Sequence, residues 1–257
     1  MEHAAGHLRE VNHAFERQSG SFATSAVANS DELRQALLDV AQPAGSERWL
    51  DAACGPGIVT RALATRAARV IGVDATEAMV QRARDAASSA GLDNVSFEVG
   101  DATNTGHPTA SFDGAVTRFA IHHIPVPGRL FGELARVVRP GGRVVVLDHL
   151  ADEDAEARSW VQEVERLRDP SHWASLSPEM MRRLAEQAGL TMVEERCFSF
   201  ELDFDDWLAR GTDDPKAVAM VDHALTVRPA GTDRFAVLAK PEGRVLRLAM
   251  WLGSWSR

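Results

Sequence analysis

The sequence predicts an α/β fold built on a doubly wound, mostly parallel sheet. Apolar, strand-like runs alternate with helical patterns across residues 48–150. The run at 144–147 is apolar throughout, as expected for a central parallel strand that is buried on both faces. A glycine turn at 55–57 follows the first run directly, and open parallel sheets bind ligands beyond the carboxyl ends of their strands.

Composition narrows the possible classes of protein. The chain has 257 residues, of which 45% are hydrophobic and 25% charged, and this predicts one globular domain. The net charge is −9 and there is no dense basic run, so nucleic acid is not expected as a partner. The two cysteines, Cys54 and Cys197, are too few and too far apart for a four-thiolate zinc site or a disulfide framework. Without an apolar leader or an apolar run of ~18 residues, we expect a cytoplasmic protein that does not contact membranes.

Local signals place the elements of the first half. Ser30 is expected to cap a helix that Pro43 stops. Thr76 is expected to cap another, with Gly91 just after its end. Strands are expected at 48–51, 69–73, 95–99, 112–117 and 144–147, with further helices after the glycine turn and at 130–138.

After residue 150 the strict alternation stops. Helices are expected at 152–168, 178–189, 205–210 and 215–227, with strands at 191–200 and 234–239. The tail, 241–257, is basic and apolar and carries Trp251 and Trp255. It is expected to form a surface helix or a helix of a homodimer interface. No internal repeat or linker is present, so we expect a single domain.

The glycine turn has an unusual acidic neighbour. Gly55 and Gly57 fit the start of a dinucleotide-binding G-x-G-x-x-G motif, but Thr60 stands where the third glycine belongs. Asp51 ends the strand before the turn, and a carboxylate there would repel a pyrophosphate and attract a cationic ligand. The alternative is an ordinary strand-to-helix turn.

Acids also end the next two strands. Asp74 is suited to accept two hydrogen bonds from a ribose diol, although a carboxylate at a helix start is favourable by itself. Asp101 could accept a hydrogen bond from an exocyclic amine such as adenine N6, or it could be a solvated turn residue. Acids at three successive strand ends are less expected by chance than any one of them.

Five ordered motifs lie in the stretch 49–149: LDAACGPG at 50–57, VD at 73–74, GDA at 100–102, RFAIHH at 118–123 and RVVRPGG at 136–142. With these motifs the stretch resembles the class I S-adenosylmethionine-dependent methyltransferases, closest to the ubiquinone/menaquinone methyltransferase-like (methyltransferase type 11) branch. The resemblance implies a Rossmann-like, seven-stranded, mostly parallel sheet with a helical cap. It also implies S-adenosylmethionine as cofactor and S-adenosylhomocysteine as product. The reaction would place a methyl group on an O, N or C atom of a small, aromatic or secondary-metabolite acceptor.

The resemblance divides the expected single domain, 1–257, into four parts. They are N-terminal lid helices at 1–45, a cofactor-binding core at 46–150, a substrate cap at 151–190, and C-terminal strands, helices and tail at 191–257. The chain departs from quinone methyltransferases at 15–17 and 22–24, and where Asp148 and His149 replace the usual Glu. A quinone acceptor is therefore not expected.

Site residues follow from the motifs and the chemistry. The expected cofactor-binding residues are Phe22, Asp51, Ala53, Cys54, Gly55, Gly57, Asp74, Ala75, Met79, Gly100, Asp101, Ala102, Arg118 and Phe119. The expected catalytic residues are His122, His123 and His149, since imidazole can act as base or acid near neutral pH. The expected substrate contacts are Arg118, His123, Arg168 and His172. Each of these has an alternative as a structural hydrogen-bonding or packing residue, and Cys54 is expected to pack beside the cofactor rather than react. No carboxylate–histidine set has metal-ligand spacing, so no metal is expected.

Two other functions fit the same pattern. One is an enzyme on this fold that uses the bound cofactor in a cyclisation without methyl transfer. The other is a non-catalytic binding module.

Overall fold

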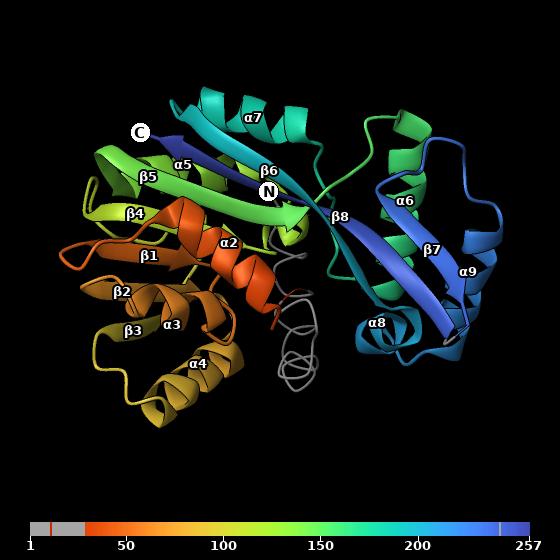
Figure 1. Ribbon diagram of the computed structural model, residues 1–257, viewed down its shortest axis with the longest axis horizontal. Helices are drawn as coiled ribbons and strands as arrows, with labels where there is room; N and C mark the ends of the chain where they lie inside the picture. Colours follow the sequence, from red (N-terminus) through yellow and green to blue (C-terminus); the bar gives the residue numbers. More distant parts are fainter. Residues whose placement is uncertain (1–10, 12–28, 242) are drawn as a thin grey trace.

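The computed structural model describes residues 11, 29–241 and 243–257. A central sheet runs through the molecule in the order β3-β2-β1-β4-β5-β8-β6, and β7 pairs with β8 beside this path (Figure 1). The strands are β1 Arg48–Ala52, β2 Arg69–Asp74, β3 Val95–Val99, β4 Phe112–Arg118, β5 Val138–His149, β6 Thr191–Asp203, β7 Phe235–Lys240 and β8 Gly243–Ser256.

The first five strands pair in parallel, and β8 is antiparallel to β5, β6 and β7. This confirms the doubly wound, mostly parallel fold. The described sheet has eight strands rather than the expected seven, because the tail forms an additional strand, β8. The expected strand at 234–239 is β7, which lies off the main path and pairs with the end of β8 that extends beyond β5.

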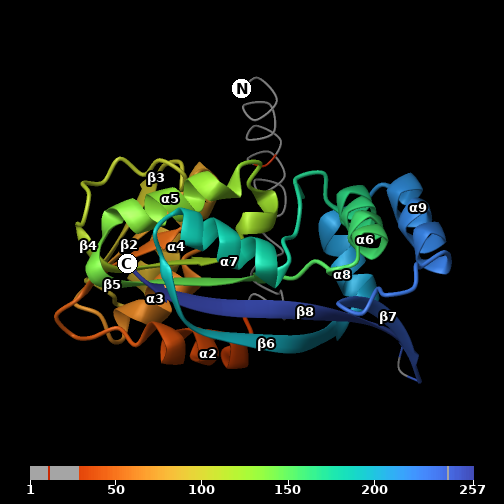
Figure 2. The same cartoon turned by 90° about the horizontal axis from the view of Figure 1, so that it is seen from above.

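Helices cover both faces of the sheet: α2 and α3 on one, α5 and α7 on the other (Figure 2). The described helices are α2 Asp31–Ala41, α3 Ile58–Ala64, α4 Glu77–Ser89, α5 Pro127–Val137, α6 Ala155–Arg168, α7 Pro178–Gln187, α8 Phe204–Gly211 and α9 Pro215–Thr226, with a short 3₁₀ turn, η2, at Ile121–His123. The odd residues of β5, such as Val145 and Leu147, pack on the α2 side, whereas Val144 and Val146 pack on the α5 side. The all-apolar run at 144–147 is thus buried on both faces, as expected.

Helix α2 lies within the expected lid at 1–45 and packs against the sheet. Ser30 caps it by accepting a hydrogen bond from the Leu33 N–H, and its apolar side, including Leu37, is buried in the core of the sheet. An amphipathic helix of this kind is stabilised by that burial, so α2 belongs to the core. The rest of the expected lid, including Phe22, lies outside the described residues apart from short stretches.

The expected cap segment at 151–190 divides in the structure. Helix α6 packs against α9, together with α8 and β7, at one end of the molecule, whereas α7 packs against α5 and β6 (Figure 1). Strands β6 and β8 run from the main sheet into the α6 group, and their apolar residues continue the core there. We use "cap" below for α6, α8, α9, β7 and the adjoining ends of β6 and β8.

The expectation of a helical tail is wrong. Residues 243–256 form β8, which lies between β5 and β6 and carries the buried Trp251 and Trp255. Leu246, Leu248 and Met250 alternate with more exposed residues, as in a strand, before the fully buried stretch begins.

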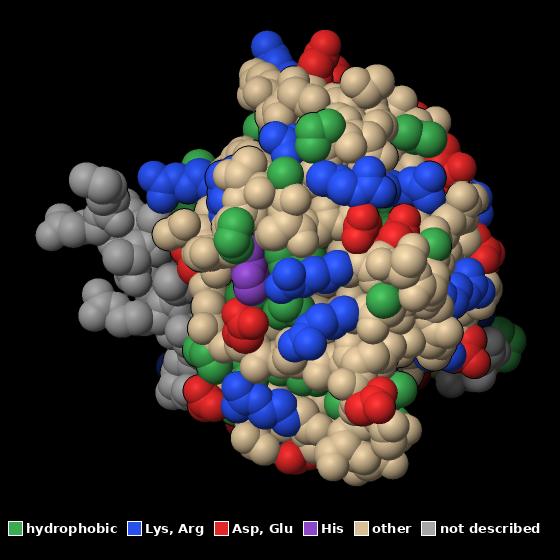
Figure 3. All heavy atoms as spheres, turned by 90° about the vertical axis from the view of Figure 1, so that its left-hand side faces the viewer, with side chains coloured by type: hydrophobic (Ala, Val, Ile, Leu, Met, Phe, Trp, Pro, Cys, Tyr) green, Lys and Arg blue, Asp and Glu red, His purple; other side chains and the backbone are tan. Residues whose placement is uncertain are grey.

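The parallel strands end on the side of the molecule that faces the cap (Figure 1). Figure 3 shows the opposite side, where basic and acidic side chains are interspersed. One such pair joins Arg139 at the start of β5 to Asp113 at the start of β4, 2.7 Å apart. The residues predicted to bind ligands lie at the other ends of these strands.

Candidate active site

The glycine turn after β1 is held from β2 by Asp74. One carboxylate oxygen accepts the Gly55 N–H at 2.7 Å and the other accepts the Thr76 N–H at 3.0 Å. Gly55 and Gly57 both have positive φ, and a Cβ on Gly57 would lie 2.8 Å from the ring of Phe97. A Cβ on Gly55 would meet no atom within 4 Å, so the backbone of the turn is open to a ligand.

Asp51 is buried beneath the turn, where Thr60 donates a hydrogen bond of 2.6 Å to its carboxylate. Thr60, which stands where a dinucleotide-binding motif has its third glycine, therefore holds the carboxylate of Asp51. Burial raises the pKa of Asp51 to about 7, although the Thr60 hydrogen bond and the charge of Arg118 act in the opposite direction. A cationic ligand would favour the ionised carboxylate.

The third strand-end acid, Asp101, is more exposed than Asp51 and Asp74. It accepts hydrogen bonds from the backbone N–H and the hydroxyl of Thr103, and the adjacent Ala102 is buried. Met79 is buried on α4. Cys54 packs with Phe97 in a small apolar cluster, and burial raises the pKa of its thiol well above the ordinary value. This thiol is unreactive in that environment.

Two non-glycine residues that follow strands have a positive φ. Ala53 has a φ of 58° after β1, and Phe119 has a φ of 54° after β4. Such conformations are strained for these residues and concentrate at functional sites. Arg118, beside Phe119, is half-buried, and desolvation lowers its pKa to about 10 against the opposing effect of Asp51.

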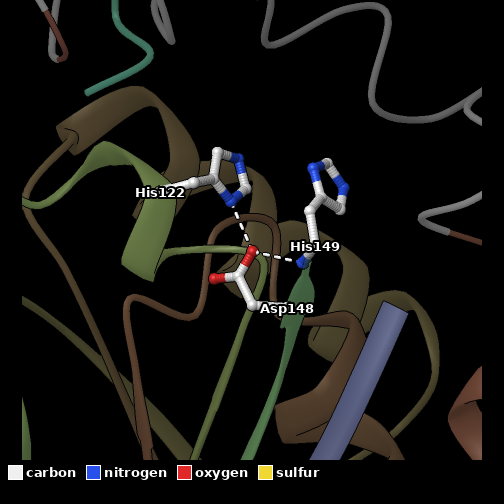
Figure 4. A group of neighbouring side chains, drawn as sticks. All are labelled: His122, Asp148 and His149. Carbon is white, nitrogen blue, oxygen red and sulfur yellow. Dashed lines mark hydrogen bonds and ion pairs between the residues drawn. The ribbon is translucent and has the colours of Figure 1, made fainter. Parts of the chain in front are cut away.

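Three histidines, His123, His149 and His172, lie around His122. The ring of His122 lies 4.1 Å from that of His123, 4.5 Å from that of His149 and 5.6 Å from that of His172, centroid to centroid. His122 and His123 lie on η2 after β4, His149 ends β5, and His172 lies in the loop after α6. Figure 4 shows His122 and His149 side by side, both linked to Asp148.

Asp148 is the buried acid that organises this cluster. One of its oxygens lies 2.5 Å from His122 Nδ1 and also accepts the His149 N–H; the other accepts the N–H groups of Ala120 and Ile121. Burial alone would raise the pKa of Asp148, but the charge and hydrogen bond of His122 lower it to about 2. Burial by itself would lower the pKa of His122. The charge and hydrogen bond of Asp148 outweigh this effect, so the pKa of His122 lies above its ordinary value. The two groups therefore form an ion pair when His122 is protonated.

The other three histidines are kept neutral. Burial and the charge of His122 lower the pKa of His123 to about 4 and that of His149 to about 3, and lower that of His172 still further. His123 Nδ1 donates to the Ser171 carbonyl at 2.9 Å, and His172 Nε2 donates to the Gln162 side chain at 2.6 Å. The first bond ties the loop after α6 to η2, and the second ties the loop to α6.

The expected substrate residue Arg168 has structural partners in the cap. Its Nε donates to the Trp207 carbonyl at 2.9 Å, and its guanidinium lies over the Trp207 ring. It also pairs with the buried Glu165. These contacts give Arg168 a role in holding α8 against α6.

His122, Asp148 and His149 each offer a potential metal-ligand atom, all within 4.8 Å of one another. However, His122 Nδ1 and Asp148 are only 2.5 Å apart, a hydrogen-bonding distance. Two atoms bound to one metal ion at ~2.1 Å would lie at least about 3 Å apart. Since both oxygens of Asp148 already accept two hydrogen bonds each, the arrangement favours an acid–histidine pair over a metal centre.

Comparison with known proteins places this geometry in a family. Residues 50–146 match the methyltransferase domain family. The phosphatidylethanolamine N-methyltransferase of Cereibacter sphaeroides is 31% identical over 149 residues, which cover 58% of this chain and 72% of that protein. The chain belongs to the class I S-adenosylmethionine-dependent methyltransferases.

Other proteins that are similar to this chain are also named methyltransferases. The uncharacterized methyltransferase YcgJ of Bacillus subtilis is 28% identical over 215 residues, covering 83% of this chain and 85% of that protein. Its crystal structure superposes with a TM-score of 0.81 at 27% identity and covers 88% of this chain and 98% of YcgJ. The aklanonic acid methyltransferase DauC of Streptomyces is 28% identical over 143 residues, covering 54% of this chain and 65% of DauC.

The methyltransferase fold brings most of the predicted site residues to the ends of β1, β2, β4 and β5. The sequence interpretation missed Asp148 as the partner of His122, and Ser171, Gln162 and Asp169 as the groups that hold the loop after α6. Asp148 follows the same rule that identified the other acids: it lies at the carboxyl end of a parallel strand.

Proposed function

We propose that this enzyme transfers a methyl group from S-adenosylmethionine to a small-molecule acceptor, with His122 as the base next to the acceptor. The observation that carries the proposal is the position of two sites at neighbouring strand ends. The open glycine turn follows β1, and Asp51 lies near the end of that strand. Asp148 lies near the end of β5 and pairs with His122 in the turn after β4. Strand β4 pairs with both β1 and β5, so the two sites are adjacent.

The residues of the first site fit S-adenosylmethionine. Each oxygen of the Asp74 carboxylate has capacity beyond its one backbone hydrogen bond, which suits a ribose diol. Asp51 would lie by the methionine end, Asp101 and Ala102 by the adenine, and Gly55, Gly57, Ala53, Cys54, Ala75, Met79, Gly100, Arg118 and Phe119 would line the rest. When bound, S-adenosylmethionine supplies an electrophilic methyl carbon with a good leaving group, and the protein's main contribution is positioning.

The second site fits an acceptor that must lose a proton. His122 would take it, oriented by Asp148, and such a base contributes about 10²–10⁴-fold to the rate. His123 and His149 would border the acceptor, and His172 would hold the loop behind it. The cap, which the strand ends face, would form the remaining wall.

Relatives support a small acceptor without fixing which one. The names of two relatives specify phosphatidylethanolamine in one case and aklanonic acid in the other. No described helix of this chain is long and apolar enough to cross a membrane.

Calorimetry with S-adenosylmethionine and S-adenosylhomocysteine tests the cofactor, and product mass tests the reaction. We expect micromolar binding of both ligands and a product heavier than its acceptor by one CH₂. A product of unchanged mass would indicate the cyclisation alternative. If the protein binds neither ligand, it acts as a binding module of another kind and the proposal is wrong.

The raised pKa of Asp51 predicts pH-dependent cofactor binding. Below about pH 7 the carboxyl is neutral, and above it the carboxylate can pair with the cofactor's ammonium group. We therefore expect the Kd for S-adenosylmethionine to fall about tenfold between about pH 6 and about pH 7.5, where that ammonium is still charged. Calorimetric titrations across this range measure the effect.

Asp51→Asn is the matched control, because an amide does not titrate. Its affinity should be weaker than that of the wild type and constant across the same range. A wild-type Kd that does not change with pH would show that Asp51 does not pair with the cofactor.

A further inference from the structure

His122 is the one member of the histidine cluster at which the structure stabilises an added proton. Its Nδ1 faces Asp148, whose carboxylate is buried and also accepts three backbone N–H groups. Because those three donors cannot move away without breaking the strand end, Asp148 stays charged and fixed behind the imidazole. A proton added to His122 therefore completes an ion pair that is already built.

The three histidines around His122 are poorer positions for a proton, because burial lowers the pKa of each, whereas burial raises the pKa of the nearby Glu165. The titratable and charged groups around His122 are His123 on η2, Asp148 and His149 on β5, Glu165 and Arg168 on α6, and Asp169 and His172 in the following loop. Asp169 accepts the backbone N–H and the hydroxyl of Ser171, and Glu165 pairs with Arg168. His123 and His172 each have one ring N–H committed to a neighbouring oxygen.

The charge of this arrangement distinguishes between acceptors. A protonated His122 attracts an oxyanion and repels an ammonium ion, and the cationic cofactor adds to the same positive potential. An alkyl amine, with a pKa of about 10.4, keeps its proton in preference to imidazole, whose pKa is about 6.5. A carboxylic acid, phenol or enol can reach the paired state, either by arriving ionised or by giving its proton to His122.

We propose that the acceptor atom is an acidic oxygen that is methylated as an oxyanion paired with protonated His122, and that amines are not substrates. This inference rests on the proposed function and makes it more specific. The acceptor O–H bond breaks and its proton moves to His122. The oxygen then forms a bond to the methyl carbon, the methyl–sulfur bond breaks with its electron pair on sulfur, and His122 later releases the proton to water.

The test uses the full chain loaded with S-adenosylhomocysteine and three probes: benzoate, 4-nitrophenol and benzylamine. Calorimetry should show that benzoate and 4-nitrophenol bind at least about tenfold more tightly than benzylamine. Benzoate affinity should fall as the pH rises and His122 loses its proton. His122→Gln should weaken benzoate binding about tenfold or more, whereas His223→Gln, at an exposed position on α9, should not change it.

Three results would overturn the inference: benzylamine that binds as tightly as benzoate, benzoate binding that is independent of pH and of His122, or no binding of either acid. The pH series needs no variant, so it remains decisive if His122→Gln does not fold. The loading step keeps the two proposals apart. Failure to bind S-adenosylhomocysteine contradicts the proposed function, whereas loaded protein that prefers benzylamine contradicts only this inference.

Discussion

Asp148→Asn is expected to lower kcat/KM for the acceptor by about 10²–10⁴-fold while leaving the Kd for S-adenosylmethionine unchanged. An asparagine can keep the two hydrogen bonds from Ala120 and Ile121 with its oxygen. Its NH₂ then faces the His149 N–H and His122 Nδ1, where the wild type has an acceptor. Nδ1 of His122 would then accept a hydrogen bond from this NH₂, so the ring proton would lie on Nε2. In this tautomer Nε2 cannot take a proton from the acceptor.

Two measurements separate this effect from general damage. Nitrogen NMR of labelled histidine should report the change of tautomer at His122. Thermal unfolding should show a moderate loss, of about 1–3 kcal/mol for the unpaired N–H of His149. His122→Gln should reduce the rate by a similar factor, and Asp148→Asn combined with it should reduce the rate little further. If the factors by which the two single variants lower the rate multiply in the double variant, the two residues do not act as a unit.

The core and the first site could be predicted from sequence because their signals are local. Parallel strands place their carboxyl ends together, so Asp51 and Asp74 had to meet near the glycine turn once the strands were recognised. The capping residue Ser30 and the stop at Pro43 were likewise visible within a few positions. Each of these features is determined by neighbours in the chain or by the register of adjacent strands.

The histidine cluster could be predicted only in part, because its geometry depends on contacts between distant segments. His122 and His149 were both expected as catalytic residues, and they follow or end adjacent strands, β4 and β5. The loop that brings His172 to them is held by Ser171 and Gln162, through bonds that no local pattern predicts. That Asp148 points at His122 depends on backbone donors contributed by the turn after β4.

The tail was misread for a different reason. Its basic and apolar composition is compatible with an amphipathic helix, and the alternation of Leu246, Leu248 and Met250 covers too few residues to exclude one. Gly253 gives the better signal in hindsight, since a Cβ there would lie 2.3 Å from the ring of Trp251. A glycine between two large aromatic residues is more typical of a packed strand than of a surface helix.

The largest effect on cofactor binding is expected for Asp74→Ala, which should weaken S-adenosylhomocysteine binding by about 100-fold or more. Two hydrogen bonds from a ribose diol to a carboxylate contribute about 1.5–3 kcal/mol each. Asp93→Ala, which removes an exposed acid in the turn before β3, should leave binding unchanged and serves as the matched control. Calorimetry gives both affinities.

Because Asp74 also holds the Gly55 N–H, lost binding could arise from a disturbed turn rather than from a lost ribose contact. A double-mutant cycle with adenosine and 2′-deoxyadenosine separates the two causes. If Asp74 holds the ribose, removing the 2′-hydroxyl should weaken binding to the wild type and have little effect on binding to Asp74→Ala. If the deoxy ligand loses the same factor with both proteins, Asp74 shapes the turn, and the ribose is held by another group.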